Sequence, residues 1–224
     1  MRTPKRYNIE GHVHFVTTTC YKRVPIFLYD LCNTSVIEAV EFYRRKHNFN
    51  LIGYTIMPDH LHLLIQLHNA TKISDIIRDV KHAVAFKILS TLKAGQQAPP
   101  YPSSKTNKHK VKLRTTESAD GASRTNGLSR GKAGLLALPS NNNILARLRL
   151  ENPGKRGHRY SIWERGFYDF NIYSEKMLKE KLDYIHMNPV RRGLVGSLGD
   201  WRYSSFRNYF LDDHSVITVD KIEL

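Results

Sequence analysis

The feature that most constrains the fold is a pair of apolar, partly β-branched runs separated by only two residues. Residues 50–57 (NLIGYTIM) are followed by Pro58 and Asp59 and then by residues 60–67 (HLHLLIQL). Turn-forming residues between two runs of this kind predict a β-hairpin. The chain is therefore expected to build an antiparallel sheet, and its remaining strands must come from elsewhere in the sequence.

Four other segments have the periodicity of regular structure. Residues 12–21 alternate and are rich in Val, Thr and aromatic residues, and residues 162–173 are also rich in aromatic residues, so both are predicted to be strands. Apolar residues recur at three- and four-residue spacing in 28–47 and in 74–92, which predicts two amphipathic helices. Ser74 is the expected N-cap of the second.

A third helix is expected near the C-terminal end. Ser174 is its predicted N-cap, and Glu175 suits the positive end of the helix dipole. We expect this helix to end near Met187, because Pro189 disfavours helical geometry in the residue before it. The aromatic segment 193–209 that follows is expected to pack on the core.

The order of elements, β-α-β-β-α-β-α, predicts an α+β fold. It is that of a ferredoxin-like or RRM-like sandwich, a mostly antiparallel sheet with helices packed on one face. We expect one domain in two parts, residues 1–93 and 161–210, with a tail at 211–224. Residues 94–160 are expected to be a long, flexible, basic insertion, since their few apolar residues cannot offset the entropy of ordering. Local order is expected within it at 144–150 (ILARLRL).

The charge of the chain points to a polyanionic partner. Lys and Arg number 35 against 20 Asp and Glu, a net charge of +15. This excess favours nucleic acid, although a basic, ribosome-like surface is an alternative. The two cysteines, Cys20 and Cys32, fit neither a zinc motif nor a disulfide framework. With no apolar run of membrane-spanning length and no signal-peptide pattern, a cytoplasmic protein is expected.

His60 and His62 are candidate metal ligands. On a strand, residues two apart project from the same face, so the two imidazoles lie together. Two neutral imidazoles can bind a divalent ion and leave coordination positions open. Leu61 and Leu63 would then point into the core. Taken alone, the pair is a weak signal, because two histidines on an exposed face are more often solvated.

His12 and His14 form a second pair with the same spacing, and a small domain has room for one such metal site. The later pair is favoured because it follows a Pro-Asp turn and has a candidate third ligand on a distant helix. We expect His12 and His14 to be sheet-surface residues near DNA.

The distant helix lies in KEKLDYIHMNPVRRGLV. Tyr184 and Asn188 are four residues apart and share a helix face. The Asn188 oxygen is a plausible third ligand, and the same register brings the Tyr184 phenol beside the metal. A phenol needs a nearby cation to become a good nucleophile, and Lys181 is on the same side. Singly, Tyr184 could be a core aromatic and Asn188 a helix C-cap.

Together these segments resemble a known family. MPDHLHLLIQL, IWERGFYDFNIY, LDYIHMNPVRRGLV and DWRYSSFRNY, in this order, resemble the REP-associated tyrosine transposases. These belong to the HUH single-tyrosine superfamily, with the small transposases of insertion sequences. The resemblance covers residues 7–93 and 160–210. The basic insertion between them is a departure, because compact relatives lack it.

The resemblance implies a role for each matching residue. His60 and His62 would be the HUH pair, Asn188 the third metal ligand and Tyr184 the nucleophile. It also implies a ferredoxin-like fold, and single-stranded or hairpin DNA as partner, with repetitive extragenic palindromes among the candidates. We expect a bacterial cytoplasmic enzyme, associated with the nucleoid when bound to DNA, and either a monomer or a homodimer.

The expected reaction is DNA nicking and rejoining. Tyr184 would attack the phosphate in line, forming a covalent 5′-phosphotyrosine and releasing a 3′-hydroxyl, and another 3′-hydroxyl would reverse the step. Mg²⁺ or Mn²⁺ is the expected cofactor on the grounds of phosphate chemistry, although two histidines would also suit Zn²⁺.

Basic and aromatic side chains are expected to contact DNA. The candidate phosphate clamps are Lys181, Arg191 and Arg192, which could equally be an ordinary solvated basic face. Some aromatics could stack on unpaired bases, though core packing is expected for most of them. They are Trp163, Phe167 and Tyr168.

Two other classes of function remain open. One is a non-catalytic nucleic-acid-binding protein of the RRM type, which would normally carry aromatic motifs where this chain has a histidine pair. The other is a metal-dependent hydrolytic nuclease in which water attacks, although the dense carboxylate cluster of two-metal enzymes is missing from the sequence. A covalent protein–DNA adduct would separate all three.

Overall fold

The computed structural model describes residues 8, 10–68, 71–94, 141–153 and 158–222. Most of the expected insertion, residues 95–140, lies outside them. The strands form one sheet in the order β2-β3-β1-β4, and every neighbouring pair is antiparallel. Their bounds are β1 Val13–Thr19, β2 Phe49–Met57, β3 His60–Leu67 and β4 Tyr168–Ile172. This order is the split β-α-β arrangement, and it confirms the predicted α+β fold.

The predicted hairpin is present. Met57 pairs with His60 across the turn made by Pro58 and Asp59. The register of β2 shifts at Gly53, where a side chain would meet the helix that covers this face, its Cβ lying 2.8 Å from Leu182 Cδ2. Glycine therefore allows that helix to pack close to the sheet.

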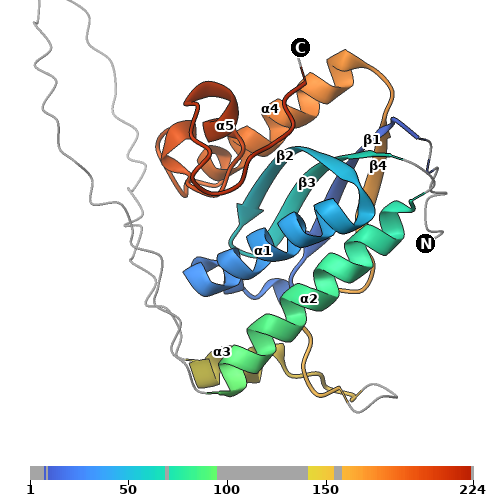
Figure 1. The fold of residues 1–224 in the computed structure, drawn as a ribbon. Coiled ribbons are helices and arrows are strands. Elements are labelled where there is room, and N and C mark those ends of the chain that lie inside the picture. The colour runs from blue at the N-terminus through green and yellow to red at the C-terminus, as the bar shows by residue number, and fades with distance from the viewer. Residues whose placement is uncertain (1–7, 9, 69–70, 95–140, 154–157, 223–224) are drawn as a thin grey trace, which may run out of the picture. The chain divides into compact units, whose positions relative to one another are not determined.

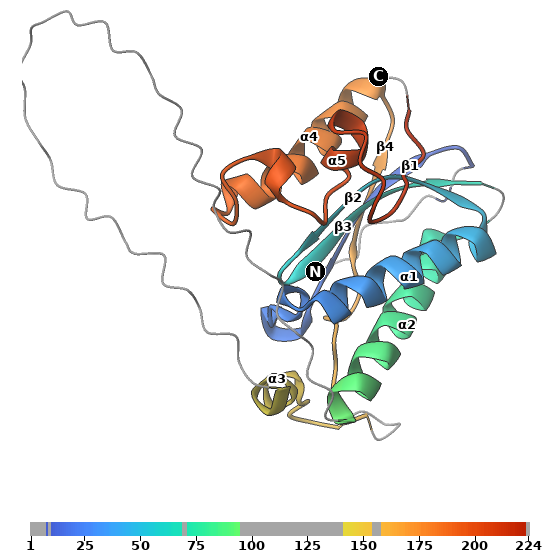
Figure 2. The ribbon, with the colours of Figure 1, turned by 60° about the vertical axis from the view of Figure 1, so that its left-hand side comes forward.

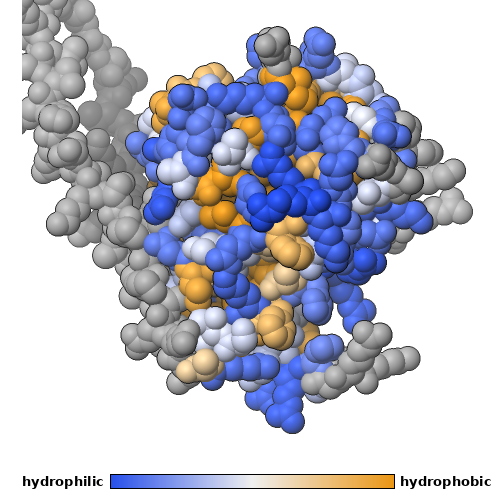
Figure 3. All heavy atoms as spheres, in the orientation of Figure 1, coloured by the Kyte–Doolittle hydropathy of each residue, from blue (hydrophilic) through white to orange (hydrophobic). Residues whose placement is uncertain are grey.

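Three long helices cover the two faces of the sheet. In Figures 1 and 2, α1 (Asp30–His47) and α2 (Ile73–Lys93) lie side by side on one face, and α4 (Glu175–Arg191) lies on the opposite face. Two helices on one face were expected, and α4 adds a third layer. Viewed from the side of Figure 1, the surface is mostly polar with smaller apolar areas between (Figure 3), as for amphipathic helices with outward polar faces.

The core beneath α4 defines which strand residues face it. One buried cluster joins the sheet to the apolar stripe of the helix. From the sheet it contains Val13, Phe15, Ile52, Leu64 and Ile172, and from α4 it contains Leu178, Leu182 and Ile185. Because side chains alternate along a strand, odd-numbered residues of β1 face α4 and even-numbered ones lie under α1 and α2.

The ends of two helices differ in how well the sequence predicted them. Ser174 caps α4 as expected, its side chain accepting a hydrogen bond from Met177 N at 3.3 Å. Ser74 was wrongly expected to cap α2, which begins at Ile73. Ile73 N donates instead to Asn8 Oδ1 at 3.0 Å. The acceptor comes from a residue distant in sequence, so the local pattern could not reveal it.

Pro189 does not end α4, contrary to the expectation that the helix stops near Met187. The helix continues to Arg191. Proline lacks the N–H that would donate to the carbonyl four residues earlier, that of Ile185. The Thr55 hydroxyl, on β2, lies 3.0 Å from this carbonyl oxygen and 2.8 Å from that of Tyr54, so its one hydrogen can donate to Ile185 in place of the missing N–H.

The segment after α4 covers the free edge of β2. Ile56 N donates to Tyr203 O and Ser205 N donates to Tyr54 O, each at 2.9 Å. The aromatic tail therefore packs on the core as expected, and it covers a strand edge that could otherwise pair with another chain. The short elements of this and other connections are η1 Tyr21–Arg23, η2 Ile26–Leu28, η3 Leu198–Asp200 and α5 Phe206–Phe210.

Two segments near the insertion complete the described fold. Helix α3 (Asn141–Leu148) buries Ile144 and Leu148, which confirms the local order expected there. The predicted strand 162–173 is shorter than expected: only β4 joins the sheet, while Trp163 forms an isolated bridge with Cys20. Among the described helices, none is long and apolar enough to cross a membrane.

Candidate active site

The two histidines of β3 face each other beside α4. His60 and His62 are both buried, their rings are nearly perpendicular, and their Nε2 atoms are 3.1 Å apart. They project from the sheet face that carries Thr17, which pairs with His62 in the register of β1 and β3. The expectation that both histidines share one face is confirmed, and Leu61 and Leu63 are buried on the other.

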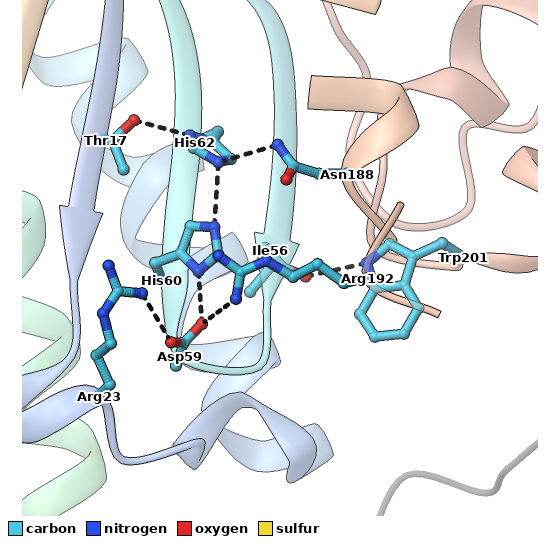
Figure 4. Close-up of polar contacts among 9 residues, drawn as sticks. All are labelled: Thr17, Arg23, Ile56, Asp59, His60, His62, Asn188, Arg192 and Trp201. Atoms are coloured by element: carbon cyan, nitrogen blue, oxygen red, sulfur yellow. Dashed lines mark hydrogen bonds and ion pairs between the residues drawn. The ribbon is translucent and has the colours of Figure 1, made fainter. Parts of the chain in front are cut away.

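A separate partner holds the other nitrogen of each ring (Figure 4). His60 Nδ1 lies 2.6 Å from Asp59 Oδ1, and His62 Nδ1 lies 2.8 Å from Thr17 Oγ1. Burial would raise the pKa of Asp59, but hydrogen bonds and charges from His60, Arg23 and Arg192 lower it to about 2. The ionised Asp59 only accepts, so His60 donates from Nδ1 and directs the Nε2 lone pair toward His62.

His62 is held in its neutral form. Burial, together with the charges of His60 and Arg192 and against the opposing effect of Asp59, lowers the pKa of His62 to about 3. An uncharged imidazole has a lone pair available for a metal ion. A carboxylate or hydroxyl on the outer nitrogen is the usual way in which a metal-binding histidine is oriented.

Asn188 reaches this pair from α4. Its side-chain nitrogen Nδ2 is 3.3 Å from His62 Nε2 and also 3.3 Å from the Tyr184 carbonyl oxygen. The amide nitrogen, and not the expected oxygen, thus faces the histidine. Half a turn about the last side-chain bond would exchange the two atoms, because the two ends of an amide have nearly the same shape.

The donor set fits an open divalent metal site. Two Nε2 atoms and one amide converge, and each imidazole has an outer partner. Among the residues that the structure describes, no three His, Cys, Asp or Glu side chains gather as a metal site. An ion held by His60, His62 and Asn188 would have further coordination positions to fill with water or substrate oxygens.

Tyr184 lies one helical turn before Asn188 and borders the same site. Its ring is 5.6 Å from that of His62 and 5.9 Å from that of Phe15, edge-on to both. The side chain is 40% exposed. The ring is therefore anchored while part of it remains accessible, so Tyr184 is not the fully enclosed core aromatic that was the alternative.

His60, His62 and Tyr184 line one open groove of about 400 Å³, large enough for a small ligand. Lys181 Nζ lies over the Phe15 ring at 5.2 Å and the Tyr184 ring at 5.9 Å. Arg192, which also lines the groove, has its Nη1 atom 3.6 Å from Asp59 Oδ1. The full lining is Phe15, Thr17, Thr19, Arg23, His60, His62, Tyr168, Lys181, Tyr184 and Arg192.

The remaining candidates lie in different places. Arg191 is exposed at the end of α4 but is not among the described residues that line the groove. Trp163 is buried and donates from Nε1 to Lys81 O at 3.0 Å, so it is a core residue. Phe167 is half-buried, whereas Tyr168 is exposed in the groove.

His14 is not on the sheet surface, so that expectation was wrong. It is fully buried on the face under α1 and α2, and its Nδ1 lies 2.9 Å from Asp169 Oδ1. The alternation of β1 puts it opposite the groove. His12 is half-buried just before β1, with its ring edge-on to Tyr173 at 5.7 Å.

Sequence reasoning missed three residues of the site. Asp59 was taken only as a turn residue, yet it holds His60 and also forms an ion pair with Arg23 at 3.0 Å. A carboxylate directly before a histidine pair could have suggested this role. Arg23 and Thr17 gave no such signal, because only the sheet register brings them to the groove.

Comparisons with known proteins find similarity to transposases. Residues 8–113 match the family model described as "Transposase IS200 like". A Haemophilus influenzae protein, provisionally named a REP-associated tyrosine transposase, is 25% identical over 206 residues, covering 92% of this chain and 86% of that protein. An Escherichia coli REP-associated tyrosine transposase is 37% identical over 46 residues, 20% of this chain and 28% of that protein.

A solved structure supports the fold. It is a REP-associated tyrosine transposase bound to a REP hairpin, with a TM-score of 0.57 and 17% sequence identity, and the match covers 100% of both chains. At this identity the likeness bears on the fold alone.

Proposed function

We propose that this chain nicks and rejoins single-stranded or hairpin DNA through Tyr184, because residues 8–113 match the IS200-like transposases and most of the chain is similar to a REP-associated tyrosine transposase. The observation that carries the proposal is the position of this tyrosine. Its ring is 5.6 Å from that of His62, in one groove with His60 and one helical turn from Asn188.

His60, His62 and Asn188 are the residues that would hold the divalent ion, with Mg²⁺ or Mn²⁺ as the proposed cofactor. When bound, the ion would act as a Lewis acid on a non-bridging oxygen of the scissile phosphate. Asp59 and Thr17 fix the two rings so that both Nε2 atoms point to the same place. This preorganisation reduces the rearrangement needed when DNA binds.

Tyr184 supplies the nucleophile. Its phenolic oxygen forms a bond to phosphorus while the bond from phosphorus to the 3′-oxygen breaks, giving a 5′-phosphotyrosine and a free 3′-hydroxyl. The phenolic proton leaves to solvent in this open groove. Attack by the 3′-hydroxyl of another strand reverses the step and rejoins DNA without an external energy source. Lys181 Nζ lies 5.9 Å from the centre of the Tyr184 ring, where its charge can attract the phosphate that Tyr184 attacks.

Two arginines are suited to hold the phosphate. Arg192 and Arg23 both reach Asp59 and line the groove, with side chains that are partly exposed. The planar guanidinium can offer paired donors to phosphate oxygens. Arg191 is proposed to contact DNA outside the groove, since it is exposed on the neighbouring turn.

Trapping a covalent adduct tests the proposal. A hairpin DNA labelled 3′ of the nick, incubated with Mg²⁺ or Mn²⁺, should give a denaturation-resistant protein–DNA adduct with wild type. Tyr184→Phe keeps the ring but removes the attacking oxygen, so it should give neither adduct nor nick while binding DNA with similar affinity. Tyr209→Phe is a matched control, because its hydroxyl donates to Ile52 O at 2.9 Å, away from the groove lining.

Two other outcomes of this experiment would favour the two alternative functions. Nicking by Tyr184→Phe with a free 5′-phosphate would mean that water attacks, which is the hydrolytic nuclease. Binding by wild type without any cleavage on a broad set of hairpins would favour the RRM-like binding protein.

A further inference from the structure

Tyr168 is a large aromatic side chain that the fold leaves open to the groove. It is the first residue of β4 and is 52% exposed, although its neighbours on the same face of that strand pack toward α4. Its ring meets that of Phe15 in a T-shaped contact, at 6.1 Å and 69°, and about half of the side chain remains accessible. Exposed aromatic rings on a sheet beside a basic groove are typical platforms for unpaired bases.

The sheet register sets the distance between Tyr168 and the histidine pair. Tyr168 pairs with Thr17, and Thr17 pairs with His62, so the three lie in one row across three strands. Adjacent strands are about 4.8 Å apart, which puts the backbone of Tyr168 roughly 10 Å from that of His62. A nucleotide whose phosphate lies between His62 and Tyr184 could therefore reach this ring with its own base or the next one.

The Phe15 ring contacts the rings of His62, Tyr184 and Tyr168. Its ring stacks on His62 at 5.5 Å and 19°, and it meets Tyr184 and Tyr168 edge-on. Lys181 Nζ lies over it at 5.2 Å, which adds positive charge between the exposed ring and the nucleophile. The buried Phe15 thus fixes the relative positions of metal ligand, nucleophile and exposed tyrosine.

We propose that Tyr168 stacks on the nucleobase next to the scissile phosphate and so positions the strand for attack by Tyr184. The proposal rests on the function proposed above and adds a base-binding subsite to it. Stacking accepts any base, because every base has a π-face. This subsite therefore fixes where the strand lies and does not select its sequence.

The test separates binding from chemistry by using the Tyr184→Phe background. The probe is a DNA hairpin with a single-stranded flank, in which one flank nucleotide at a time is made abasic. At one position, removal of the base should weaken binding about 10-fold when Tyr168 is present. When Tyr168→Leu is added to the Tyr184→Phe protein, the intact probe should bind about as weakly as the abasic probe binds when Tyr168 is present. The same abasic change should then weaken binding little further.

Tyr173→Leu is the matched control. Tyr173 is also exposed, at 62%, but it lies beyond the other end of β4 against His12 and does not line the groove. The abasic profile of this variant should equal that of the parent. Tyr168→Phe and Tyr168→Trp should keep the abasic effect, since the ring is retained. Tyr168→Thr, which also suits a strand, replaces the leucine variant should that one not fold.

If no abasic position responds to the residue at 168, or if Tyr173→Leu changes the profile as much, the proposal is wrong. Such a result leaves the proposed function intact when wild type still forms the adduct. Conversely, an abasic effect that depends on Tyr168 while wild type forms no adduct would support the subsite and overturn the proposed chemistry.

Discussion

His60 and His14 each present Nδ1 to a carboxylate, of Asp59 at 2.6 Å and Asp169 at 2.9 Å. The surroundings of the other nitrogen differ. His60 Nε2 faces His62 at the groove, whereas His14 Nε2 is buried with no hydrogen-bond partner in the described structure. His60 is therefore suited to bind a metal ion in the groove, whereas His14, on the other face of the sheet, is suited to form a buried structural contact with Asp169.

This difference predicts opposite phenotypes for two substitutions. His60→Ala should abolish metal-dependent nicking and lower Mn²⁺ affinity, measured by calorimetry, with a small change in melting temperature. His14→Ala should lower the free energy of unfolding by about 2–4 kcal/mol, because it leaves a cavity and removes one partner of the buried Asp169 carboxylate. At temperatures where it is folded, it should still bind Mn²⁺.

His12→Ala is the control for both substitutions, since this half-buried residue belongs to neither of the two histidine–carboxylate pairs, His60–Asp59 and His14–Asp169. We expect its nicking to stay within several-fold of wild type and its Mn²⁺ affinity to be unchanged. Absence of Mn²⁺ binding in the His12 or His14 variant, with His60→Ala unaffected, would show that the metal site is assigned to the wrong strand.

At the scale of elements, the hairpin could be predicted because all of its determinants are local. Two apolar runs and a Pro-Asp turn fix the pairing of Met57 with His60. The length of α4 could not be predicted, because its continuation past Pro189 depends on a hydroxyl that the sheet brings from Thr55. This longer helix keeps Asn188 and Tyr184 on one continuous face.

The role of Thr55 can be measured with a double-mutant cycle. Thr55→Val keeps the shape of the side chain but removes the donor to Ile185 O, so it should destabilise the protein by about 1–3 kcal/mol. In a Pro189→Ala background the new backbone N–H can donate to that carbonyl. Thr55→Val should then cost less, giving a coupling free energy of roughly 1 kcal/mol by denaturant unfolding.

Thr55 Oγ1 is also 3.3 Å from Ser204 Oγ and 2.8 Å from Tyr54 O. Thr55→Val removes these two interactions in both backgrounds, so the cycle cancels their effect. Equal costs of Thr55→Val in the two backgrounds would mean that the hydroxyl does not compensate for the proline.

For the whole molecule, the proposed catalytic residues stand out as motifs in the sequence, whereas the residues that support them do not. His60, His62, Tyr184 and Asn188 stand in recognisable local patterns, and the fold brings them together. Arg23 lies just after β1, and no sequence pattern there indicates that its side chain contacts the site. Positions defined by the tertiary register leave little trace in a single sequence.

The charge of the whole chain is unevenly distributed. Residues 94–160 hold 13 Lys and Arg against 3 Asp and Glu, which is +10 of the total +15. The lining of the groove is also basic, but it carries only three cations, Arg23, Lys181 and Arg192. Affinity for the DNA backbone and chemistry on it should therefore depend on different parts of the chain.

Replacing residues 102–138 with an uncharged Gly-Ser linker of equal length tests this separation. The segment carries 8 Lys and Arg against 2 Asp and Glu, and its removal spares α3 and its buried residues. Binding to single-stranded DNA should weaken, and the slope of log affinity against log salt should flatten by about 0.7 for each phosphate that the variant no longer neutralises. A scrambled segment of the same composition should restore both the affinity and the salt slope.

Adduct formation by Tyr184 at saturating protein should persist in the linker variant, because none of the proposed catalytic residues is removed. A linker variant that binds with the wild-type salt slope, or that folds and binds but forms no adduct, would contradict this division of roles.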